Sequence, residues 1–357
     1  MKTSPAANKK IRVLVIDDSA VIRHLVAEIL SQADDIEVVG TAQDPVFAAT
    51  KIRNLHPDVI TLDVEMPRMD GLTFLAELMK TDPLPVVMIS ALTQRGGETT
   101  IRALELGAVD FIAKPSIDVS KGIADLESEI ISKVRTASKA RIRVKSNGKR
   151  TVASTPPGAF QLDPGRMSTT DKIIAIGAST GGTEAITEVI AELPGATPGI
   201  VIVQHMPPVF TRSFAERLNS LSRMDVKEAQ TGNRVLRGTV LIAPGNRHMT
   251  IRRNGALYYV DISDGPLVNF VRPSVDLLFS SVARYVGKNA VGVILTGMGE
   301  DGARGLREMK EAGAFTIAQD EASSVVFGMP RRAIELNAAD RVLSLESIAG
   351  EVLKKCC

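Results

Sequence analysis

At residues 173–182 the chain runs IIAIGASTGG, a short apolar stretch that ends at a serine held between glycines. Four apolar residues bounded by turn formers predict a buried strand, and the spacing of residues 183–193 predicts an amphipathic helix after it. Ser179 should therefore lie on the turn between the two. The pattern Gly-x-Ser-x-Gly at 177–181 is typical of a nucleophile elbow: small neighbours allow a sharp turn, and the following helix directs amide N–H groups at an oxyanion beside the serine.

Two other interpretations of this turn remain open from the sequence. It can be a tight strand-to-helix connection in which the serine or the threonine serves only as the helix N-cap. It can also be a dinucleotide-binding loop, although Ser179 then takes the place of the second glycine of G-x-G-x-x-G, where the backbone approaches a pyrophosphate.

The composition is that of an ordinary globular protein of about two domains, with 357 residues of which 44% are hydrophobic and 24% charged. A formal net charge of +2 with both signs mixed gives no basic face, so we expect no nucleic acid as partner. Because no apolar run approaches the ~18 residues of a membrane span, we expect no membrane insertion and a cytoplasmic location. Cys356 and Cys357 are adjacent, so they predict neither a stabilising disulfide nor a metal site.

Residues 1–135 predict a first domain in which strands and helices alternate. An apolar β-branched strand at 11–16 is followed by apolar residues at helical spacing from Val21 to Leu30. This alternation predicts a doubly wound α/β domain, with a parallel sheet covered by helices on both faces. The other predicted strands are residues 36–40, 58–62, 86–90 and 109–112, and the other predicted helices are 45–55, 71–80, about 98–106 and from about 121 onward.

Acidic residues follow two of these strands, at the edge of the sheet where doubly wound folds bind ligands. Asp17 and Asp18 follow the first strand, and Asp63 follows the third. Converging carboxylates repel one another unless a hard cation joins them, so we predict a Mg²⁺ site with room for phosphoryl chemistry. Lys114 and Ser90, after the fifth and fourth strands, could supply an ammonium and a hydroxyl to a phosphoryl group. The alternative is that these acids are solvated loop caps.

This domain resembles the receiver domain of two-component response regulators, most clearly at residues 62–71, LDVEMPRMDG. The resemblance implies a flavodoxin-like fold, a histidine kinase as phosphodonor, and Asp63 as the phospho-acceptor with Mg²⁺ held beside it by Asp17 and Asp18. An acyl phosphate adds about −1.5 to −2 charge, which can pull a hydroxyl inward and repack a nearby surface. The switch residues that the resemblance implies are Ser90, Phe111 and Lys114.

Residues 136–170 predict a flexible linker. No acidic residue occurs between Glu129 and Asp163, while lysine and arginine accumulate, and residues 146–168 are rich in Ser, Thr, Pro and Gly. Such a segment cannot bury enough apolar surface to offset the entropy lost on ordering. Its basic charge could contact an acidic partner or nucleic acid, but no interleaved aromatic residues accompany it, which favours a solvated linker.

Residues 171–357 resume the alternation and predict a second doubly wound parallel sheet. The turn signal at Asn254-Gly255, followed by an apolar segment at 257–262, predicts a β-hairpin inserted into this domain. The predicted strands of the sheet are residues 173–176, 199–203, 239–243, 291–295 and 315–318.

Three polar residues, Ser179, His205 and Asp301, fall just past the ends of predicted strands in this second sheet. A serine hydroxyl becomes a nucleophile when a neutral imidazole takes its proton, and a carboxylate orients that imidazole and stabilises its protonated form. The three residues therefore predict a catalytic triad, in a chain order that differs from that of α/β-hydrolases.

The residues alone leave alternatives for two members of this triad. His248 also follows a predicted strand and competes with the first histidine as the base. Asp301 can simply cap the helix that begins near Ala303, which would leave Asp276 or Asp320 as the working acid.

Three motifs in this half resemble those of the chemotaxis protein-glutamate methylesterase family, CheB: residues 176–182, QHMPPVFT at 204–211 and TGMGEDG at 296–302. With the receiver in front, the resemblance covers nearly the whole chain. It implies a Rossmann-like esterase domain in which Ser179 is the nucleophile, His205 the base and Asp301 its orienting acid.

Other positions near these motifs have less defined roles. The resemblance leaves His248 as a bystander or a substrate contact. Backbone near Thr180 and Met298 is our hypothesis for the oxyanion hole.

The sequence thus predicts a phosphorylation-activated esterase that hydrolyses glutamate γ-methyl esters on chemoreceptors, deamidates receptor glutamines, and needs no cofactor at the esterase site. The unphosphorylated receiver is expected to cover the Ser179 rim, and phosphorylation to shift that packing. Response regulators with other outputs remain alternatives: a nucleotide-binding effector, a receptor scaffold, or a DNA-binding protein. The length of the output domain and its lack of a basic recognition helix disfavour the last of these.

Overall fold

The computed structural model describes residues 9–66, 70–91, 93–114, 123–142 and 172–356. The described residues form two compact units that divide after Ile142. Most of the predicted linker, from residue 143 onward, lies outside the described residues, as do Cys357 and residues 67–69 of the receiver-like motif.

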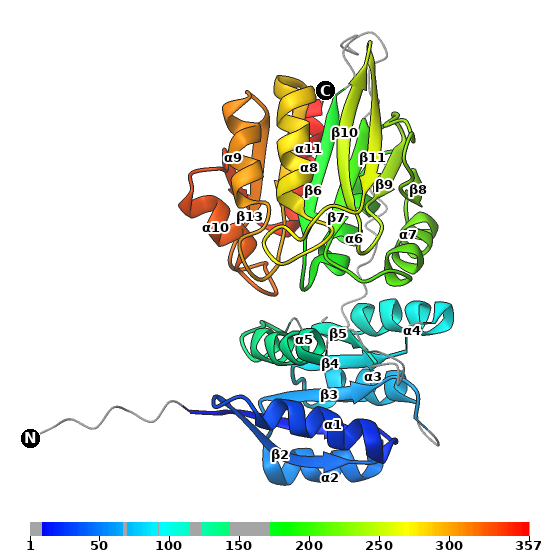
Figure 1. The fold of residues 1–357 in the computed structure, drawn as a ribbon, viewed down its shortest axis with the longest axis vertical. Helices are drawn as coiled ribbons and strands as arrows, with labels where there is room; N and C mark the ends of the chain where they lie inside the picture. Colours follow the sequence, from blue (N-terminus) through cyan, green and yellow to red (C-terminus); the bar gives the residue numbers. More distant parts are fainter. Residues whose placement is uncertain (1–8, 67–69, 92, 115–122, 143–171, 357) are drawn as a thin grey trace, which may run out of the picture. The chain divides into compact units, whose positions relative to one another are not determined.

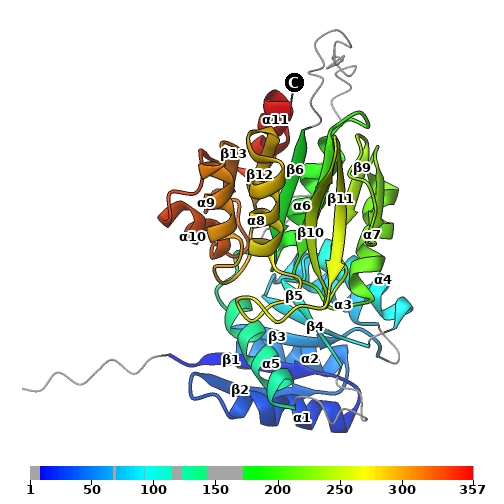
Figure 2. The ribbon, with the colours of Figure 1, turned by 45° about the horizontal axis from the view of Figure 1, so that its top comes forward.

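The first unit is a five-stranded parallel sheet in the order β2-β1-β3-β4-β5, with helices on both faces (Figure 1). Helix α1 packs beside α5, and α3 packs beside α4 (Figure 2). This is the predicted doubly wound fold with its flavodoxin-like strand order. The elements are β1 (Ile11–Ile16), α1 (Ala20–Ser31), β2 (Ile36–Ala42), α2 (Pro45–Leu55), β3 (Val59–Asp63), α3 (Gly71–Thr81), β4 (Val86–Ser90), α4 (Gln94–Glu105), β5 (Asp110–Ala113) and α5 (Ile123–Ala137).

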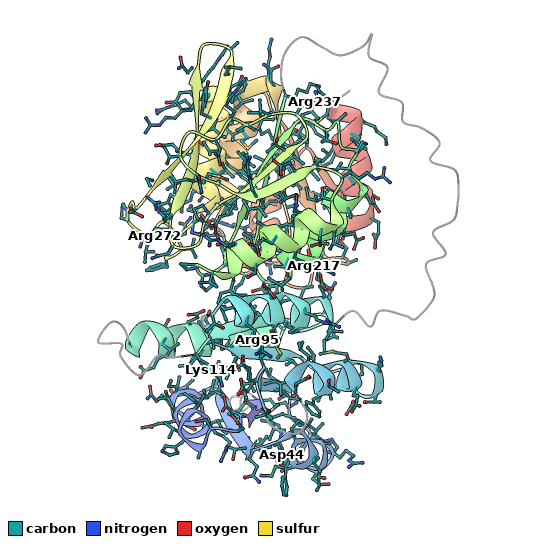
Figure 3. All side chains as sticks on the ribbon, turned by 90° about the vertical axis from the view of Figure 1, so that its right-hand side faces the viewer. Asp44, Arg95, Lys114, Arg217, Arg237 and Arg272 are labelled. Atoms are coloured by element: carbon teal, nitrogen blue, oxygen red, sulfur yellow. The ribbon has the colours of Figure 1, made fainter. Side chains whose placement is uncertain are left out.

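Polar N-cap residues mark where four helices of this unit begin. The central strands β1, β3 and β4 are mostly apolar because helices cover both faces of the sheet, and the edge strand β2 is more exposed. Four of the helices begin at a polar residue whose side chain accepts a backbone N–H of the first turn, which satisfies an otherwise unpaired donor. These N-caps are Ser19, Asp44, Asp70 and Thr93; Figure 3 labels Asp44.

The second unit is built on a seven-stranded parallel sheet in the order β14-β13-β12-β6-β7-β9-β8. Helices α8, α9 and α10 lie on one face and α6, α7 and α11 on the other (Figure 1). The strands are β6 (Ile173–Ala178), β7 (Gly199–Gln204), β8 (Asp225–Glu228), β9 (Thr239–Ile242), β12 (Ala290–Ile294), β13 (Phe315–Gln319) and β14 (Arg341–Leu343), and the helices are α6 (Gly182–Glu192), α7 (Phe210–Leu221), α8 (Val275–Tyr285), α9 (Ala303–Glu311), α10 (Met329–Glu335) and α11 (Leu345–Cys356).

The predicted hairpin is confirmed as a separate antiparallel pair, β10 (His248–Asn254) with β11 (Leu257–Ser263). Asn254 faces Leu257 across a two-residue loop formed by Gly255 and Ala256, so of the predicted Asn-Gly signal the glycine, with φ +60°, lies in the loop and the asparagine ends the strand. The sequence did not predict β8 and β14, because these edge strands are short and carry charged residues in place of an apolar run.

Close packing joins the centre of this sheet to α8. A Cβ added to Gly177 of β6 would lie 2.2 Å from Val275 Cγ1, at the first residue of the helix. A Cβ at Gly302, which has φ +89°, would lie 2.5 Å from the same methyl group. Two glycines therefore let the amino end of α8 approach the carboxyl ends of β6 and β12.

Replacing Gly177 by alanine should destabilise the chain by about 1–3 kcal/mol, because the new methyl needs the space of the Val275 side chain. Urea unfolding of the full chain measures the change. Adding Val275→Ala should recover part of the loss, since the two side chains would be in contact.

Gly350→Ala in α11 is the matched control. Among the described residues nothing lies within 4 Å of its added Cβ, so this change should be neutral or stabilising. Equal losses in the two glycine variants would contradict the packing argument.

Candidate active site

Ser179 and His205 lie at the carboxyl ends of two neighbouring strands. β6 and β7 pair in parallel as far as Ala178 and Gln204, and the His205 N–H then donates to the Ala178 carbonyl at 3.1 Å. On the other side of β6, the Ser179 N–H donates to the Thr296 carbonyl at 3.0 Å. Because paired strands lie about 4.8 Å apart, the serine and the histidine are held at the same level, one strand from each other.

The His205 ring is paired with the carboxylate of Asp301. Nε2 lies 2.9 Å from Oδ2, and the two side chains are 13% and 4% exposed. An ionised carboxylate only accepts, so Nε2 carries the hydrogen and Nδ1 is left as the proton acceptor. In the trypsin-type triad the acid contacts Nδ1 instead. Among the described residues no hydrogen bond joins the Ser179 hydroxyl to the ring, so proton transfer requires the hydroxyl to turn toward Nδ1.

The Asp301 carboxylate is held at the amino end of α8. The Val275 N–H donates to Oδ2 at 2.6 Å, and Oδ1 accepts from the Ser274 hydroxyl at 2.8 Å and from the Asp276 N–H at 3.3 Å. Burial opposes ionisation, but the hydrogen bond and charge of His205 and the other donors outweigh it, so the pKa of Asp301 is lowered. The carboxylate is therefore ionised at neutral pH and can stabilise an imidazolium.

Asp301 does not cap the helix that follows it in the chain. The N-cap of α9 is Gly302, without a side-chain hydrogen bond. The two rival acids are engaged elsewhere: Asp320 accepts a backbone N–H within its own loop, and Asp276 accepts the Gly305 N–H. Of the three acids, the structure brings Asp301 to the histidine.

The turn at Ser179 has a glycine in place of a side-chain cap. The N-cap of α6 is Gly181, with φ +76° and no side-chain hydrogen bond, so the alternative in which Ser179 or Thr180 caps this helix is wrong. A Cβ at Gly181 would lie 2.6 Å from Val325 Cβ. Both the backbone conformation and the available space therefore require glycine at this position.

The loop after β12 packs against the serine. A Cβ added to Gly297 would lie 2.7 Å from Ser179 Cβ, and the Thr296 hydroxyl donates to the Thr180 carbonyl at 3.0 Å. Met298 follows in the same loop and is 45% exposed. Thr296 and Gly297 thus lie against Ser179 and Thr180, and a role of the Thr180 and Met298 N–H groups in an oxyanion hole stays a prediction.

Two amide side chains that sequence reasoning missed support these residues. Gln204 Nε2 donates to the carbonyls of Ser179 (2.9 Å) and His205 (3.2 Å) and so ties the two together. Asn269 Nδ2 donates to Asp301 Oδ1 at 2.9 Å. The signal for Gln204 was a polar residue at the end of an apolar strand, and the sequence around Asn269 carries no signal of its own.

His248 is not placed to contact a substrate. It is 1% exposed, its Nε2 lies 2.8 Å from the Pro266 carbonyl, and its Nδ1 accepts the Ser274 N–H at 3.2 Å. Both ring nitrogens are used inside the protein, which corrects the expectation of a substrate contact. His248 instead supports the segment that presents Ser274 to Asp301.

The first unit carries the predicted acid cluster. One carboxylate oxygen from each of Asp17, Asp18 and Asp63 lies within 4.8 Å of the others. Lys114 Nζ lies 2.6 Å from Asp63 and 3.5 Å from Asp17 (Lys114 is labelled in Figure 3). Asp17 Oδ2 is buried without a hydrogen-bond partner among the described residues. A set of carboxylate oxygens with one such unsatisfied atom fits a hard cation such as Mg²⁺.

The charges of this cluster are not balanced within the protein. Burial raises the pKa of Asp63 to about 6 against the opposing effect of the Lys114 hydrogen bond, and the charge of Asp17 raises it further. Burial also raises the pKa of Asp17. For Lys114, burial opposes the charged form, but the two carboxylates outweigh it and raise its pKa. One ammonium does not neutralise three acids, which leaves room for a divalent cation.

The other two predicted switch residues are buried. Ser90 is 1% exposed and donates to the Gly96 carbonyl at 3.2 Å, not to Asp63. Phe111 is 3% exposed, and the Lys133 ammonium lies 4.9 Å from the centre of its ring. Their role as switches stays a prediction.

None of the helices in the described part of the chain combines the length and the apolar composition that crossing a membrane requires.

Each of the two units matches a known protein family. Residues 174–352 match the CheB methylesterase family, and residues 13–125 match the response regulator receiver domain. A protein-glutamate methylesterase/protein-glutamine glutaminase of Paraburkholderia xenovorans is 54% identical over 350 residues, which cover 97% of each chain. A Geobacter metallireducens protein of the same name, numbered 3, is 53% identical over 98% of this chain and 99% of its own. The crystal structure of the Thermotoga maritima CheB methylesterase catalytic domain is 41% identical, with a TM-score of 0.51, over 52% of this chain and 98% of that one.

Mg²⁺ affinity at the acid cluster should rise as the pH increases from about 5 to 7. Asp63 must lose its proton to bind the cation, and its pKa of about 6 places that loss in this range. Calorimetric titration of the full chain with Mg²⁺ at several pH values measures the effect. Asp63→Asn should weaken binding and flatten the pH dependence; an unchanged affinity in this variant would place the cation elsewhere.

Proposed function

The chain belongs to the CheB methylesterase family, whose activity is that of a carboxylic ester hydrolase, and we propose that it hydrolyses glutamate γ-methyl esters of chemoreceptors and releases methanol. The observation that carries this proposal is the His205–Asp301 pair, held at 2.9 Å one strand away from Ser179. A partly buried imidazole with an ionised partner, beside a serine on a glycine-rich turn, provides the groups that acyl transfer needs. We expect the reaction in the cytoplasm.

The first half of the reaction transfers the acyl group to the serine. His205 Nδ1 takes the hydroxyl proton of Ser179 while Oγ attacks the ester carbonyl carbon. Asp301, which accepts the hydrogen on Nε2, stabilises the imidazolium that forms. N–H groups near Thr180 and Met298 stabilise the negative oxygen of the tetrahedral intermediate. When the intermediate collapses, the Nδ1 proton passes to the departing methoxide.

The second half returns the free enzyme. A water molecule gives a proton to Nδ1 and attacks the acyl carbon, and the second intermediate expels Ser179 Oγ, which takes the proton back. The product is a glutamate carboxylate. A glutamine side chain follows the same steps with ammonia as leaving group, so deamidation needs no further residue.

The acid cluster of the receiver supplies the regulatory input of this proposal. A histidine kinase transfers a phosphoryl group to Asp63, and the Lys114 ammonium pairs with the phosphoryl oxygens. Asp17, Asp18 and Asp63 would hold Mg²⁺, which would offset the negative charge of the phosphoryl group and the carboxylates. The added charge alters the packing around Ser90 and Phe111 and raises esterase activity.

Ser179→Ala should lower methanol release from a methylated chemoreceptor by at least about 10³-fold, because the acyl group then has no acceptor. Phosphorylation of Asp63 in the same variant should be unchanged. Ser220→Ala is the matched control, since that hydroxyl donates to a carbonyl of its own helix and should leave turnover intact. Methanol release that persists in Ser179→Ala would show that the turn at Ser179 is structural and not a nucleophile elbow. Saturable nucleotide binding to this variant would favour the nucleotide-binding alternative.

A small-molecule phosphodonor with Mg²⁺ should raise the rate of methanol release by the wild-type chain. Asp63→Asn should keep the basal rate and lose the stimulation, because an amide cannot form the acyl phosphate. The comparison uses the same receptor preparation with and without the phosphodonor. Equal stimulation of both chains would rule out regulation through Asp63.

A further inference from the structure

Asn269 joins the Asp301 carboxylate to a second, half-buried carboxylate, that of Asp276. Its Nδ2 lies 2.9 Å from Asp301 Oδ1 and 2.8 Å from Asp276 Oδ2. Both partners are acceptors when ionised, so the nitrogen of the amide must face them, with one N–H directed to each. The proposed reaction uses Asp301 but has no role for Asp276 or Asn269.

The turn that carries Asn269 is built to hold this geometry. Val268 and Val271 exchange both backbone hydrogen bonds, at 3.1 and 3.0 Å, around two residues with positive φ, Asn269 at +50° and Phe270 at +63°. Asparagine tolerates this conformation and phenylalanine does so at a cost. Arg272, labelled in Figure 3, fixes the next segment by donating to Asn246 at 2.8 Å. The fold therefore keeps two residues in an unfavourable backbone conformation at the point where the Asn269 amide reaches Asp301.

The two acids have different surroundings. Asp301 faces the His205 ring and the donors at the start of α8. Asp276 accepts the Gly305 N–H of α9 at 2.8 Å, and its burial, with the nearby charge of Asp301, raises its pKa. Arg304, next to Gly305 in the chain, does not neutralise Asp276, because its guanidinium pairs with Glu300 at 3.7 Å. Asp276 thus accepts hydrogen bonds from the Gly305 N–H and from the Asn269 amide. The Asn269 amide also donates to Asp301.

We propose that Asn269 is a positioning residue, which keeps Asp301 directed at His205 by placing an amide between it and the like-charged Asp276; this inference rests on the proposed function. Two ionised carboxylates at one site repel each other, and one of them then retains a proton. The amide removes this conflict because it donates to both. Asp301 thereby stays ionised and in place.

Without the amide, the state of Asp276 controls the site. Protonated Asp276 can donate to Asp301 Oδ1 in place of Asn269, and the catalytic carboxylate stays aligned. Ionised Asp276 repels it and shifts it from Nε2 of His205. Asp276 holds the shared proton, because Asp301 is the better stabilised anion. Activity relative to the wild type should therefore fall as the pH rises.

Asn269→Gly tests this inference, because glycine keeps the positive φ and removes the amide. The measurement is kcat for methanol release from methylated receptor by the full chain between pH 5.5 and 8. The ratio to wild type should fall as Asp276 loses its proton with rising pH, by roughly 10-fold or more, within the ~10²-fold that a weakened general base can cost.

Two further variants separate positioning from loss of structure. Asn337→Gly removes an exposed asparagine that also has positive φ, at +55°, and should follow the wild type at every pH. Adding Asp276→Asn to Asn269→Gly replaces the charge by a permanent donor and should restore activity to a pH-independent ratio. A ratio that is flat in Asn269→Gly, or a double variant that stays pH-dependent, would overturn the inference.

The wild-type chain separates this result from the proposed function. A wild-type chain that releases no methanol would refute the proposed function itself. Methanol release by the wild type together with a flat ratio in Asn269→Gly would refute the positioning role and leave the esterase intact.

Discussion

The buried negative charge of Asp301 is the constraint on which the second unit depends. A carboxylate that is 3% exposed is costly unless hydrogen bonds and an opposite charge compensate it. The amino end of α8 provides that compensation through the Val275 N–H and the Ser274 hydroxyl, and His205 completes it. The helix that stabilises the acid is thus not the helix that follows the acid in the chain.

Several features of the fold follow from bringing α8 to that place. Gly177 and Gly302 make room for Val275, so the helix can approach the strand ends closely. His248, at the start of the hairpin, accepts the Ser274 N–H and so orders the residue before the helix. The hairpin inserted into the α/β domain therefore supports the surroundings of Asp301 without contacting His205 or Ser179 through any hydrogen bond given for its described residues.

The two units treat clustered acids in opposite ways. Around Asp301 the protein supplies enough donors to lower the pKa of the acid, which suits a group that must stay ionised. In the receiver, burial raises the pKa of Asp63 to about 6, and Lys114 offers a single ammonium to the cluster. The receiver cluster, with too little positive charge for its three acids, is suited to take up a cation and a phosphoryl group. Asp301, whose charge is compensated by hydrogen-bond donors, is suited to hold an imidazole.

The sequence by itself determined the strands and helices of the first unit and the central strands of the second, because apolar periodicity and the caps and glycines between elements are local properties. It also placed Ser179, His205 and Asp301 at strand ends, since parallel strands bring their carboxyl ends to one edge. The choice among the competing acids, the ring nitrogen that faces Asp301, and the supporting roles of Gln204 and Asn269 were decided by the tertiary structure alone. Each depends on hydrogen bonds between residues from different elements, and the edge strands β8 and β14 likewise form because a neighbouring strand pairs with them. Such contacts leave no periodic pattern in the chain, because what fixes them is distance in space.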